Sequence, residues 1–89
     1  MSYKVIFSEK AKKDLKILDK QMQKIILLYI EKNLENCENP YMHGKALKYN
    51  MKGYWRYRVG DYRLICEING SELKIVVITI GHRKEIYTK

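Results

Sequence analysis

The sequence contains few of the residues that hold small proteins together covalently or through metal ions. Cys37 and Cys66 are its only cysteines, and His43 and His82 are its only histidines. Cys66 lies in an apolar, strand-like stretch, where a small buried hydrophobic residue is expected rather than half of a disulfide. The histidines are far apart in sequence and do not form a zinc-binding pattern. We therefore expect no disulfide, no metal site and no cofactor.

Long apolar stretches are absent as well. The chain becomes highly charged after residues 1–7, without the apolar central region or cleavage site of a secretory signal. No run approaches the roughly 20 apolar residues that a membrane-spanning helix needs. We expect a cytoplasmic protein with no membrane partner. Its length of 89 residues and its 46% apolar content predict a single folded domain over residues 1–89.

Acidic residues are scarce relative to basic ones. The chain has 18 Lys and Arg against 10 Asp and Glu, a formal net charge of +8. Such an excess attracts polyanions, and nucleic acid is the leading class of partner. A cluster of lysines near the N-terminus is expected instead to form a solvated face that keeps the protein soluble. These lysines are Lys10, Lys12, Lys13, Lys16, Lys20 and Lys24.

The first half of the chain predicts a strand followed by two helices. Residues 3–7 are rich in β-branched and aromatic side chains, which favours a strand. Ser8 is a good N-cap for a helix that ends near Asp19. A broad apolar stripe begins at Met22 and fades over residues 33–36, which predicts a second helix that faces the core rather than a membrane.

The second half predicts a loop and then a β-meander. Residues 37–53 are irregular, and long loops in small domains are often functional, so we expect this basic loop to be functional. Its lysines are Lys45, Lys48 and Lys52. Three strands are predicted at residues 55–59, 62–68 and 73–80, joined by Gly60-Asp61 and by a turn around Asn69-Gly70. The expected fold class is α+β, with the antiparallel meander packed on a two-helix hairpin.

The first of these turns sets which side chains share a face. If Gly60-Asp61 is a two-residue turn, Arg58 lies directly opposite Arg63. One face of the meander is then apolar, with Trp55, Tyr57, Val59, Tyr62, Leu64, Cys66 and Ile68, extended by Leu73, Ile75 and Val77 if the second turn also has two residues. The other face carries Arg56, Arg58, Arg63 and Ile65, and further along Glu67, Lys74, Val76 and Ile78.

The arginines on the second face point to an anionic ligand. Like charges directly opposite each other destabilise a strand pair, and a bound polyanion would relieve the repulsion. Arginine binds phosphate in a planar, bidentate manner, whereas lysine is the usual solubilising residue. The alternative is a solvated outer face that Glu67 partly neutralises. Trp55 and the tyrosines are expected in the core or at its rim rather than as platforms for stacked bases.

Two segments together resemble the RelE branch of the RelE/ParE toxin superfamily. They are residues 53–65, GYWRYRVGDYRLI, and residues 78–87, ITIGHRKEIY. The resemblance covers nearly the whole chain. It implies an endonuclease that cuts messenger RNA in the ribosomal A site without a metal, with contacts to 16S rRNA. It also implies a cognate antitoxin protein that neutralises the toxin, and operator DNA reached only through the toxin–antitoxin complex.

The resemblance assigns the functional positions to Arg56, Arg58, Arg63, Arg83 and Tyr87. Cleavage needs a base for the 2′-hydroxyl, cations around the phosphorus and a group that protonates the leaving oxygen. The pKa of arginine, above about 12, makes the sheet arginines phosphate clamps rather than bases. Arg83 resembles the residue that stabilises or protonates the leaving oxygen. Tyr87 could orient or stack on the substrate or act in proton transfer, and His82 is the alternative base. The expected RNA contacts are Lys45, Lys48, Lys52, Lys74 and Lys84.

Two other functions stay open at this point. ParE-like toxins share the fold, poison DNA gyrase and lack the full set of nuclease residues. A non-enzymatic module would only bind its antitoxin, and the complex would bind operator DNA. The presence of all five family positions favours RNA cleavage.

Overall fold

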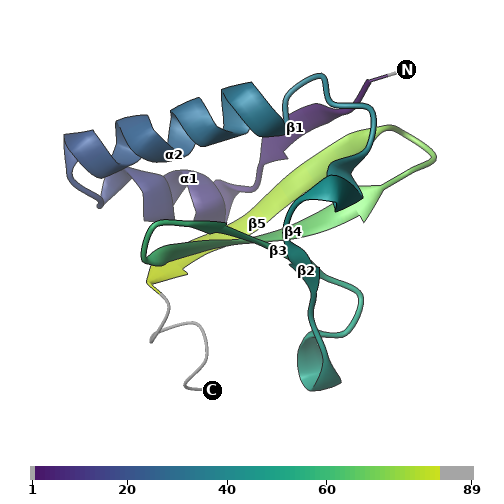
Figure 1. The fold of residues 1–89 in the computed structure, drawn as a ribbon. Coiled ribbons are helices and arrows are strands. Elements are labelled where there is room, and N and C mark those ends of the chain that lie inside the picture. The colour runs from purple at the N-terminus through teal and green to yellow at the C-terminus, as the bar shows by residue number, and fades with distance from the viewer. Residues whose placement is uncertain (1, 83–89) are drawn as a thin grey trace.

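The computed structural model describes residues 2–82, which form an α+β fold with two helices on one face of a mixed sheet (Figure 1). The helices are α1 (Glu9–Lys16) and α2 (Lys20–Asn33), and two short 3-10 turns are η1 (Pro40–Met42) and η2 (Tyr49–Met51). The strands are β1 (Lys4–Phe7), β2 (Lys45–Ala46), β3 (Trp55–Val59), β4 (Tyr62–Asn69) and β5 (Lys74–His82). Their order is β1-β5-β4-β3-β2, with β1 parallel to β5 and the other neighbours antiparallel. The predicted fold class is confirmed, and no helix within residues 2–82 is long and apolar enough to cross a membrane.

Side-chain caps define where both helices begin. The Ser8 hydroxyl accepts a hydrogen bond from the Ala11 amide at 3.0 Å, and the Asp19 carboxylate accepts one from the Met22 amide at 2.7 Å. Such caps satisfy amides that lack partners in the first turn of a helix. Because Asp19 caps α2, the first helix ends earlier than predicted, at Lys16.

The core lies between the helices and the predicted apolar face of the meander. Ile26 and Ile30 of α2 are buried against this face. The buried residues of the sheet are Tyr57, Val59, Leu64, Cys66, Ile75, Val77 and Ile80. Burial raises the pKa of the Cys66 thiol to about 12, so Cys66 acts as a small core residue, as its strand-like surroundings predicted.

The two turns of the meander differ from each other. The first pairs Val59 with Tyr62 as predicted, with Gly60 at φ 60°, the conformation that a tight hairpin favours at its first central position. The second turn is a four-residue loop across which Asn69 pairs with Lys74, so the two-residue form considered for Asn69-Gly70 is wrong. A loop longer by two residues preserves the alternation of faces, so Ile75 and Val77 still point into the core.

A β-bulge interrupts the pairing of β4 with β5. Ile65 pairs with Thr79 while Cys66 pairs with Val77, which leaves Ile78 as the additional residue. A bulge shifts every later side chain to the opposite face. The end of β5 therefore places Gly81 opposite Arg63 and His82 opposite Tyr62. The sequence pattern did not predict this bulge.

Ser8, the N-cap of α1, and Asp14 within α1 form hydrogen bonds with the part of β5 that follows its pairing with β1. The Ser8 hydroxyl donates to the Ile78 carbonyl at 2.7 Å. The Asp14 carboxylate accepts from the Thr79 hydroxyl at 2.7 Å and from the Ile80 amide at 3.0 Å. Burial alone would raise the pKa of Asp14, but these hydrogen bonds outweigh it and hold the pKa below its usual value. Side chains of α1 thus replace a missing strand partner.

Replacing Asp14 should destabilise the fold in a pH-dependent way. We expect Asp14→Ala to lower the free energy of unfolding by about 1.5–3 kcal/mol near neutral pH, because the Ile80 amide loses a charged acceptor. A lowered folded-state pKa means that the stabilisation is complete above the ordinary Asp value of about 3.9 and declines as the pH falls through the folded value. Urea denaturation at neutral pH and at about pH 3 measures the difference, which should shrink in acid. Glu9→Ala, at an exposed position of α1, is the control, and equal midpoints for the two variants would contradict this role.

Candidate nucleic-acid interface

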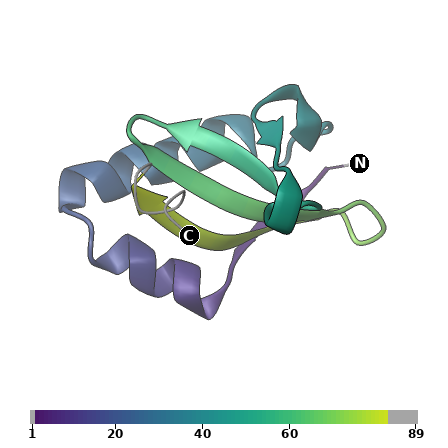
Figure 2. The same ribbon diagram turned by 90° about the horizontal axis from the view of Figure 1, so that it is seen from below.

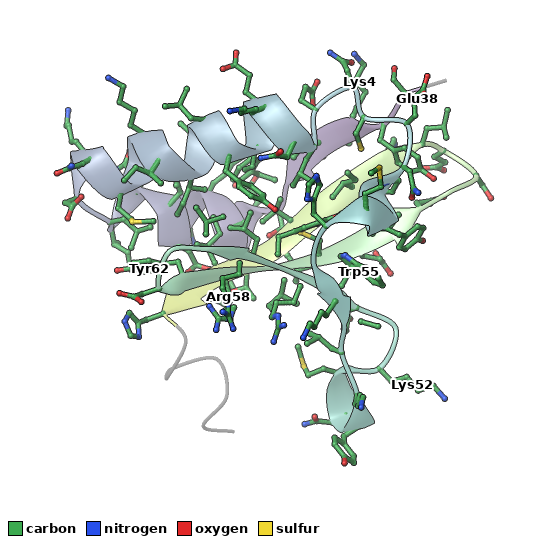
Figure 3. The ribbon with its side chains drawn as sticks, viewed as in Figure 1. Lys4, Glu38, Lys52, Trp55, Arg58 and Tyr62 are labelled. Carbon is green, nitrogen blue, oxygen red and sulfur yellow. The ribbon has the colours of Figure 1, made fainter. Side chains whose placement is uncertain are left out.

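The sheet face opposite the helices carries a cluster of cations from three strands. Arg58 of β3 pairs with Arg63 of β4, as predicted, and Arg56 pairs with Lys45 of β2. We call Lys45, Arg56, Arg58 and Arg63 the basic face. Figure 2 views the sheet from this side, and Figure 3 shows Arg58 pointing away from the helices. The short strand β2, which the sequence pattern left within a loop, brings Lys45 into the cluster.

Arg58 and Arg63 have different surroundings. Arg58 is exposed and forms no hydrogen bond or ion pair within residues 2–82. Arg63 is only 2% exposed, and its Nη1 donates to the Tyr62 carbonyl at 3.4 Å. Its buried Nε has no hydrogen-bond partner in the part of the chain that the structure describes. A buried guanidinium without a carboxylate is costly, and an anion at this face would lower that cost.

The alternative of a solvated, partly neutralised face does not hold at the centre of the cluster. Arg63 and Ile65 are both buried, although their side chains lie on the face of the sheet opposite the core. Glu67 is exposed further along β4, and neither Arg58 nor Arg63 forms an ion pair within residues 2–82. Residues 39–60 contain no Asp or Glu at all. Positive charge therefore predominates in this part of the chain.

The lysines of the predicted loop lie on the same side of the sheet. Lys48 and Lys52 flank η2, and this segment projects from the sheet away from the helices, as the label of Lys52 shows (Figure 3). Lys74 does not join them. It pairs with Asn69 at the far end of β4 and forms an ion pair with Glu72 at 3.1 Å.

His82 lies on the other side of the sheet from the basic face. Because of the bulge, His82 lies opposite Tyr62, on the side of the sheet that the helices cover. The two rings meet edge to face, with centroids 5.5 Å apart and an interplanar angle of 83°. Arg83, Lys84 and Tyr87 lie outside the described residues, so their predicted roles remain predictions.

Within residues 2–82, no group of three or more His, Cys, Asp or Glu side chains is arranged to hold a metal ion. The positive charges of the basic face are carried by arginine and lysine side chains. Guanidinium and ammonium groups of this kind bind phosphate oxygens through charge-assisted hydrogen bonds. The arrangement is suited to holding a phosphodiester against the sheet.

The tyrosines divide into two groups. Tyr57 is buried, as expected, and its hydroxyl donates to the Pro40 carbonyl at 2.6 Å. Tyr49 is 90% exposed, which the sequence analysis missed by expecting every tyrosine in the core or at its rim. The signal available was its position in a lysine-rich loop with no apolar periodicity.

Comparisons with known proteins identify the family of this chain. The family model described as "ParE toxin of type II toxin-antitoxin system, parDE" matches residues 5–87. The chain is 36% identical to Toxin RelE3 of Methanocaldococcus jannaschii over 86 residues, covering 94% of each sequence. It is 28% identical to Toxin RelG of Mycobacterium tuberculosis over 89 residues, covering 100% of each.

A solved structure gives the same result for the fold. The RelBE2 toxin–antitoxin complex from Mycobacterium tuberculosis contains a chain that superposes with a TM-score of 0.83 at 26% identity, with 93% of each chain covered. The family model bears the name of ParE, whereas the individual relatives bear names of the RelE group. The chain therefore belongs to the RelE/ParE superfamily of type II toxin–antitoxin toxins, in its RelE branch.

Proposed function

We propose that this toxin is a ribosome-dependent endonuclease that cuts messenger RNA in the A site. The observation that carries the proposal is the basic face, where the buried guanidinium of Arg63 lies opposite the exposed one of Arg58. In the proposed reaction the 2′-oxygen of the substrate attacks the adjacent phosphorus and the bond to the 5′-oxygen breaks. The products are a 2′,3′-cyclic phosphate and a free 5′-hydroxyl.

The cations of the basic face stabilise negative charge on the phosphate and do not transfer protons. The phosphorus centre gains negative charge in the transition state, and fixed guanidinium groups stabilise that charge without reorganisation. Guanidinium groups stay protonated near neutral pH, so these arginines do not serve as bases. Proton transfer then falls to residues outside the basic face, with Arg83 at the leaving oxygen and Tyr87 or His82 at the 2′-hydroxyl. With a weak base, the ribosome has to position the substrate for attack.

A cognate antitoxin is the second part of the proposal. A chain of the RelBE2 complex, which the toxin resembles, is bound to its antitoxin. The partner of this chain should carry acidic residues that complement the net charge of +8. It should also cover apolar side chains that α2 exposes, namely Ile25, Leu27 and Leu28.

A ParE-like attack on DNA gyrase is the competing function, because the matching family model bears that name. Both functions predict growth arrest when the toxin is expressed without an antitoxin. Mapping RNA 5′ ends and gyrase-linked DNA breaks in the same induced cells separates them. We expect new RNA ends within translated messages and no excess of DNA breaks. DNA breaks with intact messages would indicate a gyrase poison instead of a nuclease. The absence of both lesions would indicate a binding module.

Neutralising either arginine of the central pair should slow cleavage without unfolding the protein. We expect Arg58→Ala and Arg63→Met each to lower the single-turnover rate on programmed ribosomes by about 10²-fold, the usual effect of losing one charge-stabilising group. Arg58→Ala should be at least as stable as the parent, because it removes a like-charge pair. Lys24→Ala on α2 removes one charge from the opposite side and is the control. A loss with Lys24→Ala as large as with Arg58→Ala would mean that only net charge matters.

Substitutions at the end of β5 and in the residues that follow it in the sequence should identify the proton-transfer groups. We expect Arg83→Ala and Tyr87→Phe to reduce cleavage strongly, and His82→Gln to reduce it modestly because its ring packs on Tyr62 away from the basic face. The measurement is the single-turnover rate of each variant across pH. If His82→Gln abolishes cleavage together with the acidic limb of the profile, His82 is the base and this order is wrong.

A further inference from the structure

Tyr49 combines two features that folding does not explain. Its side chain is 90% exposed, so the ring contributes almost nothing to the core. Its backbone has a φ of 60°, in the left-handed region that a bulky residue seldom adopts. Strained conformations of this kind persist only where the surrounding structure enforces them, and they are concentrated at functional sites.

The segment around Tyr49 is closed by its own backbone hydrogen bonds. The Leu47 amide donates to the Tyr54 carbonyl at 3.0 Å, which joins the two ends of the segment. Inside it, the Lys52 amide donates to the Tyr49 carbonyl at 3.0 Å and the Met51 amide donates to the Lys48 carbonyl at 3.1 Å. The turn η2 therefore presents Tyr49 from a defined structure that projects on the side of the basic face (Figures 1 and 3).

The charges around Tyr49 are all of one sign. Lys48 and Lys52 bracket η2, and Lys45 extends the positive charge to the basic face. An exposed aromatic ring among cations is the combination by which proteins hold single-stranded nucleic acid, since the cations contact phosphates and the ring stacks on a base. A protein partner would instead need apolar neighbours around the ring, but Lys48 and Asn50 on either side of Tyr49 are both polar and exposed.

We propose that Tyr49 is a stacking platform for an unpaired RNA base, with Lys48 and Lys52 contacting the phosphates beside that base. The proposal rests on the nuclease function but adds a second contact outside the basic face. Arg58 and Arg63 act on the scissile phosphate, whereas Tyr49 holds a nucleotide elsewhere on the same strand or on ribosomal RNA. Tyr49 therefore governs the affinity for RNA and not the rate of the chemical step.

The test compares Tyr49→Ala with Tyr49→Phe, which keeps the ring. Ile17→Ala is the control, because Ile17 is an apolar residue that is 82% exposed next to α1. Binding is measured by fluorescence anisotropy with a labelled single-stranded RNA and with an abasic strand of the same length. We expect Tyr49→Ala to weaken binding to the intact RNA by about 5- to 100-fold, the range for loss of one stacked base, and to leave binding to the abasic strand unchanged. Tyr49→Phe and Ile17→Ala should bind like the parent.

Cleavage and stability complete the test. On programmed ribosomes Tyr49→Ala should raise the protein concentration that gives half the maximal single-turnover rate and leave the maximal rate unchanged. Its Tm should equal or exceed that of the parent, because alanine tolerates the left-handed backbone no worse than tyrosine. Parental affinity of Tyr49→Ala for intact RNA overturns the proposal. So does an equal loss with the abasic strand or with poly-glutamate, which would assign Tyr49 to backbone or protein contacts.

The outcomes also separate this proposal from the nuclease function. A parent protein that cuts no message but binds RNA in a Tyr49-dependent manner would refute the nuclease and retain the platform. If the parent protein cuts messages and the Tyr49→Ala variant saturates at the same concentration, the nuclease function stands and the stacking role of Tyr49 is refuted.

Discussion

The pairing of β3 with β4 couples the hydrophobic core to the basic face. The register that buries Tyr57 and Leu64 beneath the helices also sets Arg58 opposite Arg63 on the other side. A shift of one residue would exchange the two faces and expose the core, so the apolar residues enforce the position of the arginines. The free energy of core burial thus holds together two like charges that would otherwise separate.

The end of β5 depends on a second constraint, which comes from α1. The bulge at Ile78 reverses the alternation of side chains, and Ser8 and Asp14 hold the displaced strand by hydrogen bonds. As a result Gly81, which has no side chain, lies opposite Arg63, while His82 packs on Tyr62. The helix therefore contributes to the site without presenting a residue to it.

Several locally unfavourable choices of this chain lie on the side of the sheet opposite the helices. Arg63 is buried without a carboxylate, Arg58 faces it, and Tyr49 is exposed in a strained conformation. The helical side, by contrast, has conventional caps and ion pairs such as that of Lys10 with Asp14. Sequences are consistent with their fold at most positions and depart from it mainly where function requires. This distribution supports the proposal of a functional surface opposite the helices.

The sequence by itself determined the α+β class, the apolar face of the meander and the pairing of Arg58 with Arg63. These depend on the local alternation of side chains and on a glycine-containing two-residue turn, which leave no freedom of register. Only the tertiary structure decided the burial of Arg63 and the side of the sheet on which His82 lies. Burial depends on neighbours distant in sequence, and the bulge that turns His82 away is held by Ser8 and Asp14 of the N-terminal region. Contacts across some 65 residues leave no mark in the local pattern, and so no periodicity could reveal them.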